Sequence, residues 1–311
     1  MVKLLRQPGR MARRASTSGE LPNVVPESST QFRVRALLVI LLCGTPIVKV
    51  TFLQASLTCR PEISGTEIFQ GITYGCEQLM TSAEGSGFLQ WVRVDLAAPG
   101  IELYVTPMNP SALLQNKQYR LRQVAEVVES ENLAIAVNGT LFESEASWRP
   151  RLTGDLAKGV ETVVADHVVS HIWEHTYLLW FDDRLAPHLR SSKPPTSEEL
   201  AKAKWGIGGQ SVWLRNGEVW SGSSRNVDCR TAVAIDSQRK LLFLAVGNRI
   251  SPHLILQKLA NIGVKTGMLL DGGDSSSMVI GEGAIGITAG VFGGRQPVAN
   301  HFGVRARPRV E

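Results

Sequence analysis

The residues best suited to chemistry lie in the segment Asp271-Gly-Gly-Asp-Ser-Ser-Ser277. Asp271 directly follows a short apolar run, so its carboxylate is expected at the end of a buried strand, where binding sites tend to be built. The two glycines after it let the backbone come close to a ligand and expose N–H donors, and the serines add hydroxyl groups. Such a group suits a ligand that carries both a phosphate and a sugar. A tight turn in which Asp271 or Asp274 caps a helix is the competing interpretation.

Three further segments place polar side chains directly beside an apolar strand, and they contain Asn138, Arg230 and Asn300. The planar guanidinium of Arg230 is suited to bind a phosphate through two parallel hydrogen bonds. The amide groups of Asn138 and Asn300 are suited to orient a sugar hydroxyl or the phosphate. The competing interpretations are a surface arginine on an edge strand at 230 and a turn residue at 300.

Asp271 together with Asp274 offers carboxylate oxygens for a divalent cation, and the spacing does not decide whether one binds. His167, His171 and His175 recur at every fourth residue and would share one face of a helix. The β-branched residues among them favour a strand or a loop, so metal ligation by these histidines is not expected. A divalent cation is thus the one cofactor that the sequence suggests.

These segments need a rigid frame, and the hydrophobic pattern predicts one that is rich in strands. Apolar runs or alternation predict strands at 91–96, 101–106, 133–137, 177–181, 231–236, 241–246 and 267–270. The first two are expected to pair as a hairpin, and Asn216-Gly217 predicts another hairpin. A helix is expected from Pro252 to about Asn261. The predicted fold is α+β, a mixed, strand-rich sheet with a few packed helices in a single catalytic domain at 89–311.

The basic excess of the chain belongs to its first residues. The chain has 33 Lys and Arg against 28 Asp and Glu, and residues 1–35 hold seven of the basic side chains but two of the acidic ones. The remainder is therefore balanced, and no basic patch for a nucleic acid is predicted.

The N-terminal residues have the pattern of a targeting signal. Residues 1–35 are rich in Ser, Pro and Arg and are expected to be disordered. Residues 36–55 are apolar apart from Lys49, which fits either a signal peptide or a membrane signal anchor. The protein is accordingly expected outside the cytoplasm, as a secreted, periplasmic or membrane-anchored protein.

Residues 56–88 are interpreted as a linker. Cys59 and Cys76 could form a disulfide if the chain is exported.

Taken together, the polar segments resemble the phosphodiester glycosidase family. The family is marked by Asn-Gly-Gly-Phe-Phe, Arg-Thr-Ala, Asp-Gly-Gly-Gly-Ser-Ser and Arg-Pro-Val-x-Asn. This chain has Asn138-Gly-Thr-Leu-Phe142, Arg230-Thr-Ala232, Asp271-Gly-Gly-Asp-Ser-Ser276 and Gln296-Pro-Val-Ala-Asn300, in the same order over roughly 88–306. It departs at Thr140, Leu141, Asp274 and Gln296, and Arg295 is a candidate to replace the arginine missing at 296.

The resemblance implies hydrolysis of a sugar-1-phosphodiester at the glycosyl C–O bond, with a sugar phosphate or an exported polysaccharide as substrate. It implies catalytic roles for Asp271, Asn138 and Arg230. It assigns substrate binding to Gly139, Gly272, Gly273, Ser275, Ser276, Asn300 and Arg295. Asp274 would add a negative charge near the phosphate, which raises the question of whether substrate handling is the same.

Two alternatives from other functional classes remain at this point. One is a non-catalytic envelope protein that binds polysaccharide, which the substituted family positions favour. The other is a metal-dependent phosphodiesterase that cuts the P–O bond. The nature of the product and the effect of a chelator separate these alternatives from a glycosidase.

Overall fold

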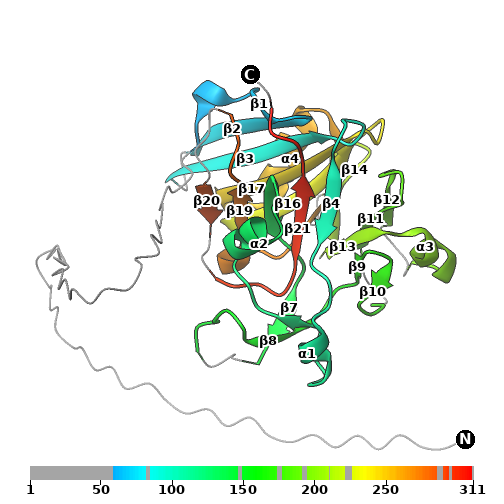
Figure 1. The fold of residues 1–311 in the computed structure, drawn as a ribbon. Coiled ribbons are helices and arrows are strands. Elements are labelled where there is room, and N and C mark those ends of the chain that lie inside the picture. Colours follow the sequence, from blue (N-terminus) through cyan, green and yellow to red (C-terminus); the bar gives the residue numbers. More distant parts are fainter. Residues whose placement is uncertain are drawn as a thin grey trace, which may run out of the picture. The chain divides into compact units, whose positions relative to one another are not determined.

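The strands form four antiparallel sheets in the computed structural model, which describes residues 59–81, 85–145, 149–173, 177–190, 195–209, 211–220, 226–285, 290–293 and 296–309 (Figure 1). The largest sheet has the order β1 (Glu67–Phe69), β2 (Ile72–Thr81), β3 (Gly85–Asp95), β17 (Leu241–Ile250), β16 (Asp228–Asp236), β18 (Val264–Leu269), β14 (Ser211–Arg215) and β15 (Glu218–Val219). The predicted strand-rich α+β character is thus confirmed, although the strands divide among several sheets.

Three smaller sheets complete the frame. One has the order β20 (Gly290–Gly293), β19 (Ser277–Ile280), β6 (Ile135–Asn138), β21 (His301–Arg305) and β4 (Glu102–Val105). Another has the order β10 (Val168–Val169), β9 (Val163–Ala165), β13 (Trp205–Gly209), β11 (Tyr177–Phe181) and β12 (Pro187–Arg190). The smallest consists of β5 (Tyr119–Arg120), β8 (Leu156–Gly159) and β7 (Phe142–Ser144).

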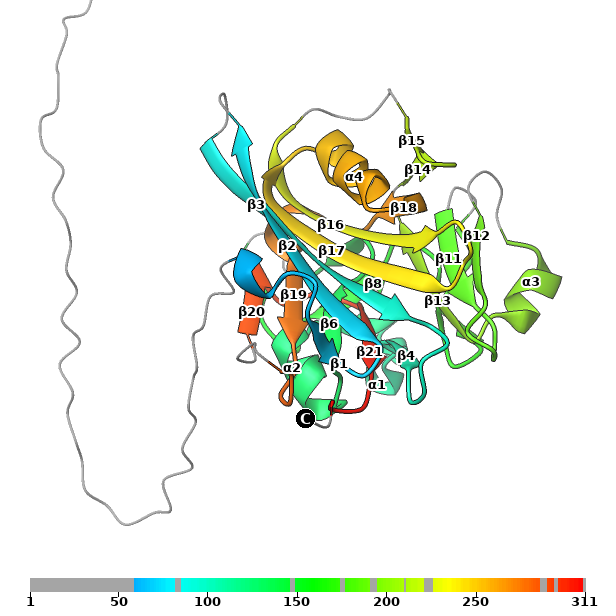
Figure 2. The ribbon, with the colours of Figure 1, turned by 90° about the horizontal axis from the view of Figure 1, so that it is seen from above.

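Alternation along the central strands explains how the largest sheet is buried on both faces. Val233 and Ile235 of β16 point into the main core, which the smaller sheets also line. Ala232 and Ala234 point to the opposite face, against α4 (Pro252–Asn261). Successive side chains of a strand face opposite ways, so one apolar strand serves two cores. Figure 2 shows α4 on one side of β16 and β17, and β6, β19 and β21 on the other.

Within the described ranges the helices are few and short, and α4 begins and ends at residues that favour helix ends. Ser251 caps α4 by accepting a hydrogen bond from the Leu254 N–H at 3.2 Å, and Gly263 adopts a φ of +96° just after the helix. On the outer face of the β19–β6–β21 sheet lies α2 (Val124–Ser130), which packs through Val124, Val127 and Val128. The remaining helices are α1 (Pro110–Leu113), α3 (Ser197–Lys202) and the 3-10 helices η1 (Pro61–Ile63) and η2 (Gly273–Ser275).

The two predicted hairpins have different outcomes. Asn216 and Gly217 join β14 to β15 with φ values of +54° and +85°, which confirms the second hairpin. The strands at 91–96 and 101–106 exist as β3 and β4, but their pairing as a hairpin is wrong. β3 pairs with β2 and β17, whereas β4 pairs with β21 in another sheet. Residues 97–100 therefore carry the chain from one sheet to the next.

The interpretation of residues 56–88 as a linker also needs correction. The described residues from 59 onward form η1, β1, β2 and the start of β3, and β2 pairs with β3 along ten residue pairs. Ile68, Phe69, Ile72 and Tyr74 are buried in the main core. These residues are thus part of the folded sheet, because their alternating apolar side chains complete one edge of it.

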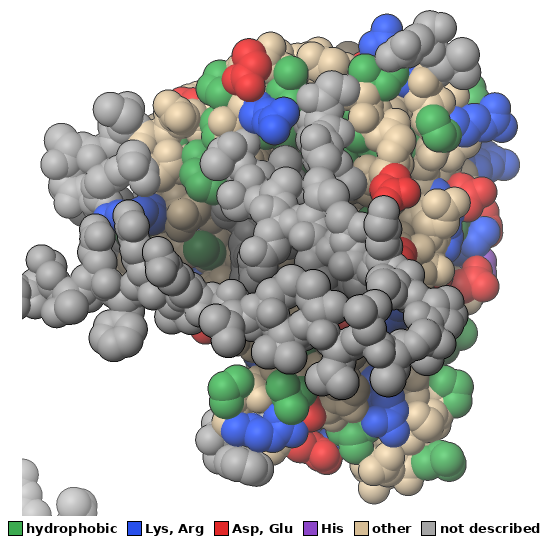
Figure 3. All heavy atoms as spheres, turned by 60° about the vertical axis from the view of Figure 1, so that its left-hand side comes forward, with side chains coloured by type: hydrophobic (Ala, Val, Ile, Leu, Met, Phe, Trp, Pro, Cys, Tyr) green, Lys and Arg blue, Asp and Glu red, His purple; other side chains and the backbone are tan. Residues whose placement is uncertain are grey.

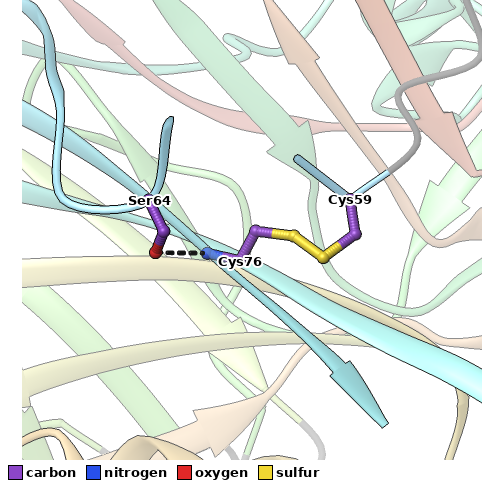
Figure 4. Close-up of a disulfide and its surroundings, with 3 residues drawn as sticks. All are labelled: Cys59, Ser64 and Cys76. Atoms are coloured by element: carbon purple, nitrogen blue, oxygen red, sulfur yellow. Dashed lines mark hydrogen bonds between the residues drawn. A yellow bond between two sulfur atoms is a disulfide. The ribbon is translucent and has the colours of Figure 1, made fainter. Parts of the chain in front are cut away.

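A disulfide joins the predicted pair Cys59 and Cys76, with their Cα atoms 5.6 Å apart (Figure 4). The Cys76 N–H also donates a hydrogen bond to the hydroxyl of Ser64 at 3.2 Å. The bridge ties the residues before η1 to the middle of β2.

The predicted disordered segment 1–35 and the predicted signal segment 36–55 lie outside the described residues. In the ranges that the structure describes, no helix is both long enough and apolar enough to cross a membrane. The described side chains visible in Figure 3 include Lys and Arg as well as Asp and Glu, scattered over that face. This distribution agrees with the balanced charge of the sequence.

Candidate functional site

Asp271 follows β18 directly and lies where several polar segments meet. Its N–H donates to the Gly139 carbonyl at 3.0 Å, and the preceding Leu270 N–H donates to the Thr231 carbonyl at 2.9 Å. One carboxylate oxygen of Asp271 accepts a hydrogen bond from the Gly272 N–H at 2.9 Å. These backbone hydrogen bonds to Gly139, which follows β6, and to Thr231 of β16 hold the Asp271 backbone in place.

Asn138, the last residue of β6, connects the segments of this region. Its amide oxygen accepts hydrogen bonds from the Thr231 hydroxyl at 2.7 Å and from the Ser277 N–H at 3.0 Å. Its amide nitrogen donates to the Asp271 carbonyl at 2.8 Å. The side chain is fully buried, and these bonds occupy its oxygen and one of its N–H groups. The Asn138 side chain therefore links the end of β6 to β16, to the Asp271 backbone and to β19, while its catalytic role stays a prediction.

Asn300 makes a second, similar connection from the residue before β21. Its amide oxygen accepts a hydrogen bond from the Thr140 N–H at 2.8 Å, and its amide nitrogen donates to the Thr140 hydroxyl at 3.0 Å. Thr140 stands where the family has glycine, so its hydroxyl adds a bond that glycine lacks. A Cβ atom on Gly139 would lie 1.9 Å from the Asn300 amide oxygen, which explains why glycine is required there.

Arg230 packs over the backbone of the turn that follows Asp271. A Cβ atom on Gly272 would lie 3.0 Å from one terminal nitrogen of the Arg230 guanidinium, so glycine makes room for this side chain. The other terminal nitrogen donates to the Asn226 carbonyl at 3.1 Å. Arg230 thus places a positive charge beside Gly272, and its role in anion binding stays a prediction.

Arg151 approaches the same turn from the opposite end, and sequence reasoning missed it. Its guanidinium donates to the Ser275 hydroxyl at 3.0 Å and lies 5.2 Å from the centre of the Phe142 ring. The residue belongs to a loop without hydrophobic periodicity and is 124 positions from Ser275. Nothing in the local sequence separates Arg151 from the other loop arginines.

The loop that presents Arg151 is closed by an ion pair. Arg149 donates to both carboxylate oxygens of Asp155, at 2.9 and 2.7 Å. The Asp155 carboxylate also accepts the Leu152 N–H at 2.8 Å, and the Leu121 N–H donates to the Asp155 carbonyl at 2.8 Å. Arg151 therefore projects from a tight loop that is joined to the residues after β5.

Burial raises the pKa of the Asp271 carboxyl above its usual value. Hydrogen bonds from Ser275 and Gly272 and the positive charge of Arg151 act in the opposite direction. Asp274, in contrast, is exposed. A carboxylate in such a setting is suited to accept a proton from water or to stabilise a developing positive charge.

The described residues give no support to a metal centre. No group of three or more His, Cys, Asp or Glu side chains that could hold a metal ion is found among them. One Asp271 oxygen is bonded to the Gly272 N–H, and His171 is hydrogen bonded to the Val160 carbonyl at 2.9 Å. His175 lies outside the described residues.

Most of the site residues predicted from the sequence come together in this network. Those linked by the bonds and contacts above are Asn138, Gly139, Arg230, Asp271, Gly272, Ser275 and Asn300. Gly273 belongs to the same turn, with a φ of +60°, and Ser276 is fully buried beside it. Arg295 lies outside the described residues.

A model of the phosphodiester glycosidase family matches residues 131–305. The fold is similar to the catalytic domain of zebrafish N-acetylglucosamine-1-phosphodiester alpha-N-acetylglucosaminidase, auto-inhibited by its pro-peptide. That similarity has a TM-score of 0.54 at 12% identity and covers 81% of this chain and 95% of that one. A hypothetical protein from Synechocystis is similar with a TM-score of 0.48 at 13% identity, over 76% of this chain and 62% of that one. No curated protein sequence matches the chain.

Proposed function

Because the chain belongs to the phosphodiester glycosidase family, we propose that it hydrolyses a sugar-1-phosphodiester at the bond between the anomeric carbon and the phosphate oxygen. One observation carries the proposal beyond the family match. Two guanidinium groups, those of Arg151 and Arg230, flank the Gly272–Ser275 turn that begins at the Asp271 carboxyl. Two cations beside a carboxyl suit a substrate in which a phosphodiester anion adjoins a sugar.

In the proposed reaction, Arg151 and Arg230 bind the phosphate oxygens. The bond from the anomeric carbon to the phosphate oxygen breaks, and the phosphate monoester leaves with the electron pair. Water adds to the anomeric carbon and loses a proton, for which Asp271 is the acceptor. A phosphate monoester is a good leaving group, so the site needs anion binding and stabilisation of an oxocarbenium-like centre more than it needs a strong general acid.

Asp271→Asn tests this assignment. An N-acetylglucosamine 1-phosphodiester is the natural first substrate, because the solved relative is named for that compound. We expect kcat to fall by about 100-fold or more, since general base catalysis typically contributes 10²–10⁴-fold. Undiminished turnover would remove Asp271 from the mechanism.

Hydrolysis in ¹⁸O-labelled water separates the proposed reaction from the alternatives. Cleavage at the glycosyl C–O bond places the label in the released sugar, whereas cleavage at P–O places it in the phosphate. Loss of activity with a chelator, together with labelled phosphate, would identify a metal-dependent phosphodiesterase. Binding of polysaccharide without turnover of any diester would instead favour the envelope-protein alternative.

We further propose that the protein works outside the cytoplasm, on an exported glycan. The Cys59–Cys76 disulfide supports this, because such bridges persist in oxidising compartments. The apolar pattern of residues 36–55 is the second support. N-terminal sequencing of the exported protein decides between a cleaved signal peptide, with a start after about residue 55, and a retained membrane anchor.

A further inference from the structure

A cavity of about 390 Å³ lies beside the candidate site and has no role in the reaction described above. Val227, Asp228, Cys229, Asn248 and Arg249 line it. Most of the lining residues belong to a bulge between β16 and β17. At this bulge Asp228 pairs with Ile250, whereas Arg230 pairs with Gly247. Cys229 therefore faces two residues of the partner strand, and Arg249 adopts a φ of +52° there. Bulges and left-handed non-glycine residues of this kind cluster next to active sites, where they redirect side chains.

The cavity adjoins the turn that follows Asp271. A Cβ atom on Gly273 would lie 3.5 Å from an Asp228 carboxylate oxygen. The pKa of the Cys229 thiol is raised by burial and then by the negative charges of Asp228 and Asp274, and it is lowered by the positive charge of Arg230, so all three charges act on this cavity residue. Arg230, which packs over Gly272, is the next residue of the same strand. Asp228 and Arg230 thus lie beside consecutive glycines of the turn, so a phosphate bound at Arg230 would have the cavity next to it.

The lining has the chemistry of a site for hydroxyl groups. The Asp228 carboxylate and the Asn248 amide oxygen accept hydrogen bonds, and the Asn248 amide nitrogen and the Arg249 guanidinium donate them. The Cys229 thiol donates to the Asn248 amide oxygen at 3.4 Å, which orients that amide. The volume of about 390 Å³ is near the lower end for ligand sites, which suits a short polyol or one sugar ring.

The balance of charge also restricts the ligand. Asp228 and Arg249 line the cavity, and the charges of Asp274 and Arg230 also act on Cys229. Because Arg230 is assigned to the phosphate, the acceptor is left with two carboxylates and the Arg249 guanidinium. Asp274 replaces a glycine of the family pattern, so one of the two charges is a departure of this chain. Like charges repel, and an acceptor with its own carboxylate is disfavoured beside them.

We propose that this cavity is the subsite for the acceptor part of the phosphodiester, and that it selects a neutral polyhydroxylated acceptor over an anionic one. The inference rests on the proposed function. The inference assigns a binding place to the acceptor side of the diester and names the chemical class of the acceptor.

Three substrates that differ only in the acceptor test the subsite: N-acetylglucosamine 1-phosphate joined to methanol, to glycerol or to glycerate. We expect kcat/KM to be about tenfold higher for the glycerol diester than for the methyl diester, the effect of one or two hydrogen bonds. The glycerate diester should be the poorest substrate. Turnover of all three at equal kcat/KM would overturn the subsite while leaving the proposed function intact.

Two variants assign the effect to the cavity. Asn248→Leu removes the amide and should bring the ratio of kcat/KM for the glycerol and methyl diesters close to one. Asp274→Gly, at an exposed position, should raise kcat/KM for the glycerate diester relative to the glycerol diester by several-fold. Gln238→Ala, in the exposed turn between β16 and β17, is the control and should change neither ratio. A loss shared equally by all three substrates in both cavity variants would contradict the proposal.

Alkylation of Cys229 gives a readout that needs no turnover. Glycerol 3-phosphate should slow the reaction of Cys229 with iodoacetamide more than inorganic phosphate does, as followed by mass spectrometry of the peptide. Protection without turnover of any diester would refute the proposed function but retain a polyol phosphate site. Equal protection by both compounds, with no preference for glycerol, would remove the subsite.

Discussion

At the scale of single residues, the polar groups of the site divide into those that hold it and those that remain to act. Asn138 and Asn300 are fully buried and spend their amides on other segments of the chain. The catalytic role predicted for Asn138 and the substrate-binding role predicted for Asn300 stay predictions; the sequence could not show these hydrogen bonds, because a short motif does not reveal the partners of its side chain. Arg151 could not be predicted from the sequence, because it belongs to no motif and only the fold brings it to Ser275.

Arg151→Met keeps an apolar stem of similar length but removes the charge. We expect kcat/KM to fall by roughly 10–100-fold, in line with the 1.5–3 kcal/mol of a hydrogen bond to a charged group. Because Arg151 lowers the pKa of Asp271, the acidic limb of the pH–rate profile should also move to higher pH. Arg184→Met, at an exposed position, is the control. An unchanged kcat/KM would show that Arg151 does not touch the substrate.

Gly139→Ala should damage the site through its frame. The new methyl group would overlap the Asn300 amide, so the bonds between Asn300 and Thr140 must break or move. We expect a loss of about 2 kcal/mol or more in the free energy of unfolding, as for other buried polar groups left without partners. Thr140→Ser, which keeps the hydroxyl, should unfold at nearly the urea concentration of the parent. If Gly139→Ala and Thr140→Ser unfolded at the same urea concentration, this account would be contradicted.

At the scale of elements, the sequence predicted strands well and their partners poorly. Continuous apolar runs located β11, β16 and β17, and Pro252 marked the start of α4, because each of these signals lies within the element itself. One partner of β3, the strand β17, and the partner of β4, the strand β21, lie more than 100 positions away in the sequence, and no local pattern reveals them. The interpretation of residues 56–88 as a linker was wrong for a related reason. The role of β1 and β2 becomes clear from the sheet edge that they complete, which the local sequence does not show.

The loop closed by Arg149 and Asp155 is an element whose role can be tested. The pair is partly buried, with the side chain of Arg149 31% exposed and that of Asp155 13% exposed, so Asp155→Ala should lower the free energy of unfolding by about 1–3 kcal/mol. It should also lower kcat/KM of the folded enzyme by several-fold, because the loop presents Arg151 to Ser275. In the double variant with Arg151→Met, this further loss should disappear, since the loop acts through Arg151. Additive losses would show a role that is independent of Arg151.

At the scale of the whole molecule, the cores are held together by a few buried polar contacts between sheets and loops. His301, at the start of β21, is fully buried; one ring nitrogen lies 2.8 Å from the Thr106 hydroxyl and the other 3.2 Å from the Arg122 carbonyl. Burial lowers the pKa of His301 to about 3. The imidazole is therefore neutral in the folded protein, and it joins the start of β21 to residues just after β4 and β5.

This histidine makes stability depend on pH. In the unfolded chain, the His301 imidazole binds a proton below a pKa of about 6.5, whereas in the folded protein it stays neutral down to about pH 3. The free energy of unfolding should therefore fall as the pH drops through this window, by about 1.4 kcal/mol per pH unit from His301. Urea unfolding at pH 7 and pH 5 measures the effect. His301→Asn should show a smaller drop than the parent, whereas the exposed His167→Asn should match it.

The position of β21 has a consequence for the order in which its sheet can assemble. This strand follows β4, β6, β19 and β20 in the sequence, yet it lies between β6 and β4 rather than at an edge of the sheet. A growing chain thus lacks an interior strand of that sheet, and the Asn300 connection, until residues 300–305 have been synthesised. The strands β4 and β6 therefore wait without their shared partner, and this sheet closes only when β21 pairs with both of them.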